Sequence, residues 1–236
     1  MALRGHFSFC RTAHNIRTKI TYYREMDEKV DILQPPLFLP TGEIKTRKQA
    51  YDDGNWIGTF NLWIVTSIPE PAIVYQQRSP ASTWAPSLLD VTAGGHFQAG
   101  EKLTDGLREV DEELGKQYAP NDLIYLGRKL YVGFNTDDSS HNNIIDIYMI
   151  EDNSPLNSYR LEEAEVYALC ACPVRQLQRA HHDPTYRFQV DAVKADGSQT
   201  VIDVDKASFP ENWDSYHHKI ALLAGRYFDG ETDLLY

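Results

Sequence analysis

A dense set of carboxylates follows a pair of glycines near the middle of the chain. The segment Gly94–Gly115 reads GGHFQAGEKLTDGLREVDEELG, and its acids include Glu109, Glu112 and Glu113. Acidic side chains three or four residues apart are neighbours on one face of a helix, where each like-charged pair costs a few tenths of a kcal/mol. A hard divalent cation such as Mg²⁺ binds oxygen ligands and would offset this repulsion. The pattern therefore leaves two interpretations open, a metal site and an ordinary solvated acidic face.

A helix must position these acids. Four apolar residues recur at helical spacing in the same segment, namely Leu103, Leu107, Val110 and Leu114. A helix over Glu101–Leu114 would turn them toward the core and place the three glutamates on roughly the opposite face. Arg108 would then reach Glu112 one turn on, and Gly115 would end the helix.

The remaining pattern predicts a mixed sheet with interspersed helices, which is an α/β fold. Strands are expected at Phe60–Ser67, Pro71–Ser79, Leu88–Ala93, Asp122–Phe134, Asn143–Glu151 and Glu165–Val174. A short helix should begin at Val174, a hairpin should turn at Asp196–Gly197, and an amphipathic helix should cover Ser215–Phe228. The histidine pairs His181–His182 and His217–His218 are expected in a loop and on a helix surface.

Composition limits the function. The chain has 236 residues and a formal net charge of −11, so its field repels phosphate backbones and disfavours nucleic acid as a partner. A small phosphorylated substrate remains compatible if a cation bridges the two negative partners. Cys10, Cys170 and Cys172 are too sparse for a disulfide framework, and the last two fit a buried strand. Without a run long enough to span a bilayer or a signal-peptide core, the sequence predicts a soluble, cytoplasmic protein with no membrane partner; a homodimer stays open.

The spacing of the acidic segment resembles the Nudix box, G-x5-E-x7-R-E-U-x-E-E-x-G-U, where U is a bulky apolar residue. Gly95, Glu101 and the run Arg108–Gly115 supply its fixed positions. Two positions depart from the pattern: the gap from Glu101 to Arg108 is one residue shorter, and Lys116 replaces the last apolar residue. The core R-E-U-x-E-E-x-G is complete, so Gly95–Gly115 is identified as a Nudix box.

The resemblance extends beyond the box, over roughly residues 30–174. TGEIKTRKQAYDDGNWIGTFNLWIV, VYQQRSP and LLDVTAGGHFQAGE look like the isomerase-like subgroup of Nudix hydrolases. This likeness implies an N-terminal extension over residues 1–29 and a Nudix domain over 30–236 that carries a C-terminal hairpin and helix. The implied fold is an α/β/α sandwich with a mixed sheet.

The resemblance also implies an activity, the hydrolysis of a nucleoside diphosphate linked to a moiety X, with Mg²⁺ or Mn²⁺ as cofactor. By position, Glu109, Glu112 and Glu113 would bind metal, with one of them a candidate general base. The backbone carbonyl of Gly95 would add a ligand, and Arg108 would orient a carboxylate. Glu101 would stabilise the loop or bind metal through water.

Further residues are weaker candidates. Some family members take the base from a later loop, where Glu163 and Glu165 are the nearest acids here. Arg78 and His96 could contact substrate, although a salt bridge and a structural hydrogen bond are equally ordinary roles for them. Five aromatic residues could stack a base or belong to the core, namely Trp56, Trp63, Trp84, Tyr118 and Tyr125.

Two rival functions remain. Isopentenyl-diphosphate isomerases share this fold but need a cysteine on the strand before the box, and this chain has none between Cys10 and Cys170. A catalytically silent binding module is the second rival, but such proteins usually lose box carboxylates that are all kept here. The sequence leaves nucleoside di- or triphosphates, nucleotide sugars and prenyl diphosphates open as substrates.

Overall fold

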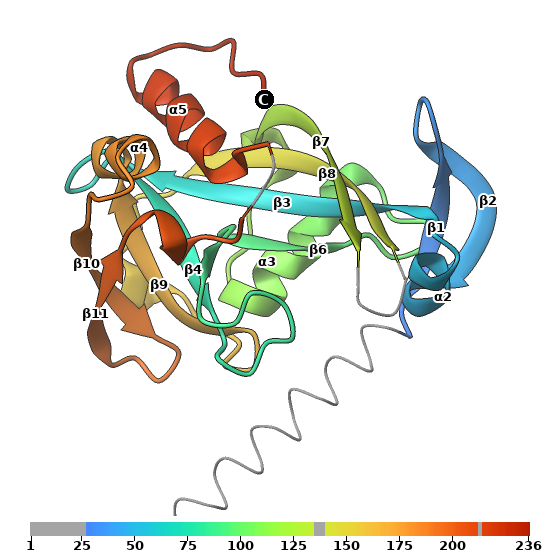
Figure 1. Ribbon diagram of the computed structural model, residues 1–236, viewed down its shortest axis with the longest axis horizontal. Coiled ribbons are helices and arrows are strands. Elements are labelled where there is room, and N and C mark those ends of the chain that lie inside the picture. Colours follow the sequence, from blue (N-terminus) through green and yellow to red (C-terminus); the bar gives the residue numbers. More distant parts are fainter. Residues whose placement is uncertain (1–26, 135–139, 212–213) are drawn as a thin grey trace, which may run out of the picture.

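A computed structural model describes residues 27–134, 140–211 and 214–236; the side chains of Leu103 and Phe134 are not described. Its helices are α2 (Arg47–Asp52), α3 (Leu107–Leu114), α4 (Val174–His182) and α5 (Tyr216–Phe228). Its strands are β1 (Lys29–Gln34), β2 (Leu39–Thr46), β3 (Trp56–Thr66), β4 (Ala72–Arg78), β5 (Leu89–Asp90), β6 (Ala93–His96), β7 (Ile124–Phe134), β8 (Ser140–Glu151), β9 (Val166–Pro173), β10 (Phe188–Lys194) and β11 (Gln199–Val204). All strands belong to one sheet around the long β3 (Figure 1).

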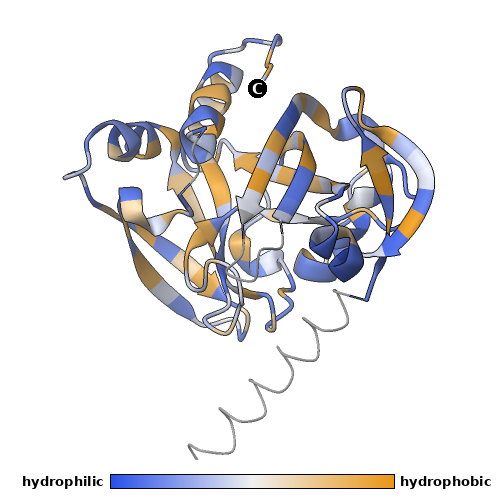
Figure 2. Cartoon of the chain, turned by 45° about the vertical axis from the view of Figure 1, so that its right-hand side comes forward, coloured by the Kyte–Doolittle hydropathy of each residue, from blue (hydrophilic) through white to orange (hydrophobic). Residues whose placement is uncertain are grey.

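The sheet lies between helices because its central strand is apolar on both faces. In β3, Trp63 and Val65 belong to the core cluster that includes residues of α4 and α5. The intervening Leu62 and Ile64 belong to a second cluster with Val110 and Leu114 of α3. Successive strand residues point to opposite faces, so α3 covers one face and α4 and α5 cover the other. The predicted sandwich is confirmed, and Figure 2 shows the hydrophobic strands between the helices.

The sheet is mixed, and its strands separate beside β3. β8 runs parallel to β3 from Trp56 to Val65 along one edge. On the other edge, β6 pairs antiparallel with Thr59–Leu62 and β4 with Ile64–Thr66. The single strand expected over Leu88–Ala93 is therefore two short strands, β5 beside β4 and β6 beside β3. This division places the glycines Gly94 and Gly95 at the centre of the molecule.

The acidic helix is shorter than predicted. The α-helix covers Leu107–Leu114, a 3₁₀ turn covers Leu103–Gly106, and Glu101 is outside both. Gly100 has φ +85° and precedes the 3₁₀ turn, while Gly106 precedes the helix. Glycine is a poor helix former, which explains why the regular helix begins only after Gly106. Gly115 ends it in the left-handed conformation, as expected.

The C-terminal half follows the prediction except at its histidines. β10 and β11 form the expected hairpin, and α5 packs on α4. His181 and His182 are the last residues of α4 rather than a loop. His217 is buried rather than on the surface, because its ring packs against Trp63, Tyr75 and Phe209.

A hairpin of β1 and β2, followed by α2, projects at one end of the molecule (Figure 1). Thr46 caps α2 with a reciprocal bond to Gln49. The proposed N-terminal extension lies almost wholly outside the described residues. Among the helices that the structure describes, none is long and apolar enough to cross a membrane.

Candidate active site

Helix α3 presents its glutamates in three different environments. Val110 and Leu114 are completely buried and fix the helix on the sheet. Glu113, one residue before Leu114, is also buried, with 5% of its surface exposed. Glu109 has a side chain that is 15% exposed and Glu112 one that is 58% exposed. The simple helical pattern implied that the three acids share one solvated face. The structure shows that they do not.

Arg108 joins three carboxylates. Its Nη2 donates to Glu109 Oε1 at 2.8 Å and its Nη1 to Glu112 Oε2 at 3.0 Å. Its Nε donates to Glu101 Oε1 at 3.1 Å, and the other oxygen of Glu101 accepts from the backbone N–H of Gln98. Arg108 is thus placed to orient two box glutamates, and Glu101 fixes both the arginine and the preceding loop.

The two glycines of β6 allow the glutamates to approach the sheet. A Cβ on Gly95 would lie 2.2 Å from Glu109 Cδ, far inside van der Waals contact. A Cβ on Gly94 would lie 2.7 Å from both Asn61 Oδ1 and the backbone oxygen of Phe60. The N–H of Gly94 also points to Glu113 Oε2, 3.4 Å away. Glycine is needed here for close approach, since neither position has a positive φ.

The buried carboxylates repel one another. Burial raises the pKa of Glu109 to about 7, against the opposing effect of Arg108 and with further increases from Glu112 and Glu165. Burial also raises the pKa of Glu113 well above its ordinary value, and the neighbouring charges of Glu165 and Glu109 add to this. Both shifts have the sign expected when negative charges are taken out of water beside other negative charges.

One cavity of about 500 Å³ gathers most of the predicted residues. Those that line it are Arg78, Gly95, His96, Glu109, Glu112, Glu113 and Glu165. Arg108, Glu101 and Glu163 do not line it. Arg108 contacts Glu109 and Glu112, and Glu101 contacts Arg108. Among the five aromatic candidates, only Trp84 lines the cavity, whereas Trp63 is fully buried in the core.

Arg78 fixes a loop at the edge of this cavity. Its Nε donates to the backbone oxygen of Trp84 at 2.9 Å and its Nη2 to Ser82 Oγ at 2.8 Å, while Asp90 lies 3.6 Å from Nη1. Arg78 therefore has the structural role, including an ion pair, that the sequence offered as an alternative to substrate contact.

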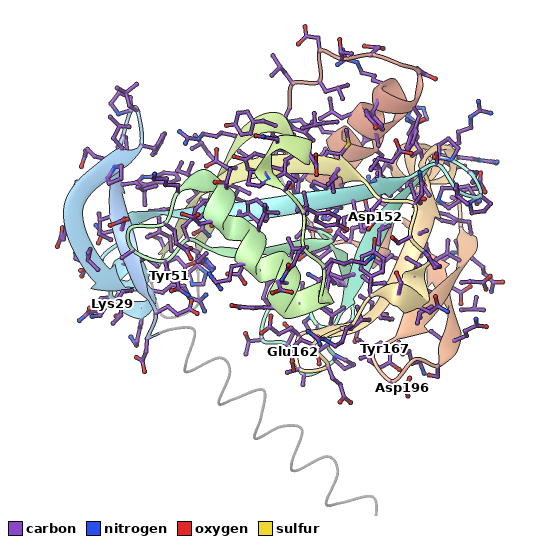
Figure 3. The ribbon with its side chains drawn as sticks, turned by 180° about the vertical axis from the view of Figure 1, so that it is seen from behind. Lys29, Tyr51, Asp152, Glu162, Tyr167 and Asp196 are labelled. Atoms are coloured by element: carbon purple, nitrogen blue, oxygen red, sulfur yellow. The ribbon has the colours of Figure 1, made fainter. Side chains whose placement is uncertain are left out.

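His96 has a defined hydrogen-bonding state. Its Nδ1 lies 2.9 Å from Arg47 Nη1, and because arginine only donates, Nδ1 accepts. Nε2 then carries the hydrogen and donates to the Tyr51 hydroxyl at 2.6 Å, which donates to Asn143 at 3.3 Å. Burial, followed by the nearby Arg47 charge, lowers the pKa of His96 well below its usual value. His96 is therefore a neutral link; Tyr51 lies near the β1–β2 end of the molecule (Figure 3).

Several cavity residues were not singled out from the sequence. Thr59 and Asn61 come from β3, Lys129 from β7, and Asn143 from β8. Their signal was present, because each is a polar residue in or beside an otherwise apolar strand. Arg47 and Tyr51 come from α2 and gave no comparable signal.

The donor set fits a hard cation. Carboxylate oxygens of Glu109, Glu112, Glu113 and Glu165 line one cavity, and oxygen is the ligand that Mg²⁺ and Mn²⁺ favour. The Glu109 carboxylate also packs directly against Gly95, where a Cβ would lie 2.4 Å from its Oε1. In the described part of the chain, however, no three His, Cys, Asp or Glu side chains are gathered closely enough to hold a metal ion. Arg108 draws Glu109 and Glu112 to itself, and the acids repel one another when no cation lies between them.

The fold and this cavity define an α/β protein with a site lined by carboxylates. The family model of the NUDIX domain matches residues 61–193, so the chain belongs to the Nudix family. A curated relative, an uncharacterized Nudix hydrolase of Clostridium acetobutylicum, is 32% identical over 157 residues, covering 65% of this chain and 72% of its own length.

Two solved structures are also similar. The crystal structure of DR0079 from Deinococcus radiodurans has 18% identity and a TM-score of 0.48, covering 64% of this chain and 86% of that one. The NUDIX domain of Shewanella oneidensis NrtR, solved with ADP ribose, has 15% identity and a TM-score of 0.40, covering 52% and 77%.

Proposed function

We propose that this Nudix hydrolase cleaves a diphosphate linkage in a small phosphorylated substrate of the type NDP-X, using Mg²⁺ or Mn²⁺. The observation that carries the proposal is the gathering of Glu109, Glu113 and Glu165 at one cavity, where burial and mutual repulsion raise the pKa of the first two. Such a cluster is stabilised by added positive charge. A diphosphate is also negative, so a divalent cation is the natural link between the two.

Each box residue has a role in this proposal. Glu109, Glu112, Glu113 and the backbone carbonyl of Gly95 would hold the metal, whose charge would polarise the diphosphate and lower the pKa of bound water. Arg108 keeps the Glu109 and Glu112 carboxylates oriented through its hydrogen bonds. Glu101 acts one step further away, because it fixes the arginine.

Glu165 is the better of the two candidates for the general base. It lines the cavity, and its charge acts on both Glu109 and Glu113, whereas Glu163 does not line the cavity. The backbone oxygen of Glu165 accepts from Ser79 N–H at 2.8 Å, which fixes this loop beside the end of β4. In the proposed reaction the Glu165 carboxylate takes a proton from water, the water oxygen bonds to phosphorus, and a phosphorus–oxygen bond of the diphosphate breaks.

The cysteines favour hydrolysis over isomerisation. Cys170 and Cys172 are fully buried in β9 within the core cluster and are not among the cavity residues. Cys10 lies outside the described residues. In this proposal the resemblance to the isomerase-like subgroup therefore concerns the scaffold. The sparse cysteines favour a reducing, cytosolic setting for the hydrolase.

The test is a screen for release of the cleavage products, which are the nucleoside monophosphate and phosphorylated X for a compound NDP-X, over nucleoside di- and triphosphates, nucleotide sugars and prenyl diphosphates, each with Mg²⁺ and with Mn²⁺. We expect metal-dependent release from at least one substrate, and its loss in Glu112→Gln. Release that continues in a chelator, or equal release by the variant, would contradict the proposal.

A further inference from the structure

One face of the sheet carries buried polar side chains where it lines the cavity. Thr59 and Asn61 come from β3 and Asn143 from β8, and their exposures are 9%, 8% and 8%. Thr59 pairs with Ile145 of β8, and Tyr131 of β7 pairs with Asn143, so these side chains share one face of three adjacent strands. We name Thr59, Asn61 and Asn143 the polar floor. The floor lies on the α5 face, since Asn61 Nδ2 donates to the Tyr216 hydroxyl at 3.0 Å.

The Thr59 hydroxyl is the informative member of the floor. It is buried and, among the described residues, has no hydrogen-bond partner. A buried hydroxyl without a partner is unfavourable, and such groups in native proteins call for an explanation. Because Thr59 lines the cavity, a bound molecule can supply the missing partner.

The floor is polar without carrying net charge. Its own members are a hydroxyl and two amides. The adjacent Lys129 is paired with Asp214 at 3.1 Å and lies over the Tyr216 ring, 4.0 Å from its centroid. His96 pairs with Thr59 across the strands and is hydrogen-bonded to Arg47. These surroundings suit a neutral group that both donates and accepts hydrogen bonds.

An aromatic wall borders the same cavity. Trp84 is 50% exposed, and its ring meets the edge of Tyr131 at 6.2 Å between centroids. Arg78 fixes the backbone of Trp84, and the following Ala85 and Ser87 have positive φ values of 43° and 64°. Strained non-glycine residues of this kind concentrate at binding sites. A half-exposed tryptophan offers a flat apolar surface for one face of a ring.

We propose that the polar floor and Trp84 bind the X group of the substrate, and that X is a hydroxyl-bearing ring such as a sugar. The inference rests on the proposed function, with the glutamates acting on the diphosphate and the floor choosing X. A sugar presents hydroxyl groups to the floor and a C–H face to Trp84. A prenyl chain in the same place would leave the Thr59 hydroxyl without a partner, and sites built to bond a hydroxyl group discriminate strongly against molecules that lack it.

The test compares kcat/KM for a nucleoside diphosphate hexose and for isopentenyl diphosphate, both with Mg²⁺. Thr59→Val keeps the shape of the side chain and removes its hydroxyl; it should lower kcat/KM for the hexose substrate about tenfold or more, which corresponds to about 1.4 kcal/mol. Thr59→Val should leave kcat/KM for isopentenyl diphosphate unchanged or raise it. The melting temperature should stay the same or rise, because the unpaired hydroxyl is gone. Thr59→Ser should restore the hexose value to within about threefold, since it restores the hydroxyl.

Thr66→Val is the matched control on the same strand. Thr66 Oγ1 donates to Asn153 at 2.8 Å, away from the cavity, so this change should lower the melting temperature and leave kcat/KM unchanged. The inference is overturned if Thr59→Val leaves kcat/KM for the hexose substrate unchanged or lowers kcat/KM for both substrates equally. It is also overturned if the wild type has the higher kcat/KM for the prenyl substrate. If no diphosphate is turned over, the proposed function fails, and calorimetric binding of the nucleoside diphosphate hexose still decides the inference. Weaker binding to Thr59→Val would support it, and equal binding would overturn it.

Discussion

At the scale of single residues, the three box glutamates have different environments. Glu113 is buried, Glu109 mostly so, and Glu112 is largely exposed and bonded to Arg108. The nearby charge of Glu165 adds to the rise that burial causes in the pKa values of Glu109 and Glu113. A residue's place in the motif therefore does not fix its role.

The neighbouring acids Glu163 and Glu165 form a matched pair. Glu165→Gln should reduce turnover on the order of a hundredfold, the scale seen when a general base or a charged contact is lost. Glu163→Gln should stay within about threefold of the wild type, because Glu163 does not line the cavity. Single-substrate kinetics at saturating Mg²⁺ measure both, and equal losses in the two variants would rule out a distinct role for Glu165.

The raised pKa of Glu109 predicts how the stability of the metal-free protein depends on pH. The pKa of Glu109 is about 7 in the folded protein against an ordinary value of 4.5, so between these values the folded state holds a proton that the unfolded chain has released. Stability from this group is present below about pH 4.5 and is lost as the pH rises toward 7. Melting temperatures in chelator should therefore fall across this window, and less steeply in Glu109→Gln. Identical slopes for variant and wild type would contradict the assignment.

At the scale of elements, helix α3 can pack closely on the sheet only because β6 and the 3₁₀ turn before the helix contain glycines. Gly95 and Gly106 both lack room for a Cβ, but the obstructing groups differ. A Cβ on Gly95 would meet the flexible end of the Glu109 side chain. A Cβ on Gly106 would lie 2.4 Å from Cγ of Phe60, whose ring is completely buried. The first glycine therefore serves the site and the second serves the core.

The two alanine substitutions should separate these roles. Gly95→Ala should displace the Glu109 carboxylate, weakening Mn²⁺ binding and turnover at least tenfold with little loss of stability. Gly106→Ala should mainly lower stability, by about 1–3 kcal/mol for an overpacked core. Urea unfolding and Mn²⁺ titration measure the two effects, and the opposite pattern would show that the roles are reversed.

These elements also show what the sequence could and could not predict. Local apolar spacing was enough for β3, β4, β9, α5 and the β10–β11 hairpin, because each buries a regular pattern. The start of α3 was wrong because Gly106 interrupts an otherwise helical pattern. The polar floor could not be assembled, since the parallel pairing of β3 with β8 brings together residues more than eighty positions apart. The loop contact between Arg78 and Trp84 likewise depends on backbone geometry that no spacing rule encodes.

At the scale of the whole molecule, residues outside the matched family domain also line the cavity. The matched domain is residues 61–193, yet Glu28, Arg47 and Tyr51 line the cavity from before it, and Pro210 and Tyr216 from after it. The helix α3 glutamates line the cavity together with Glu165, and residues from both ends of the chain complete its lining. The cavity is therefore shaped in part by residues outside the matched domain.

Tyr216 ties the C-terminal helix to the cavity. Its hydroxyl accepts from Asn61 Nδ2 at 3.0 Å and from Trp63 Nε1 at 2.9 Å. Tyr216→Phe leaves both buried donors without this acceptor and should lower the free energy of unfolding by about 1–3 kcal/mol. Tyr227→Phe, on the same helix, removes a solvent-exposed hydrogen bond to Glu151 Oε2 and should cost less than about 0.5 kcal/mol. Denaturant unfolding compares the two, and equal costs would show that the buried hydroxyl does not stabilise this junction.

The central claim is that the carboxylates of α3 perform metal-dependent hydrolysis of a diphosphate. Its most direct test is turnover of the substrate selected by the screen, measured with Mg²⁺, with Mn²⁺ and with chelator, for the wild type and the Glu112→Gln, Glu113→Gln double variant. Circular dichroism would establish that the variant is folded. We expect wild-type turnover that requires metal and a fall of about a hundredfold or more in the variant, because two charged oxygen ligands are lost. Full metal-dependent activity in the folded double variant would contradict the account.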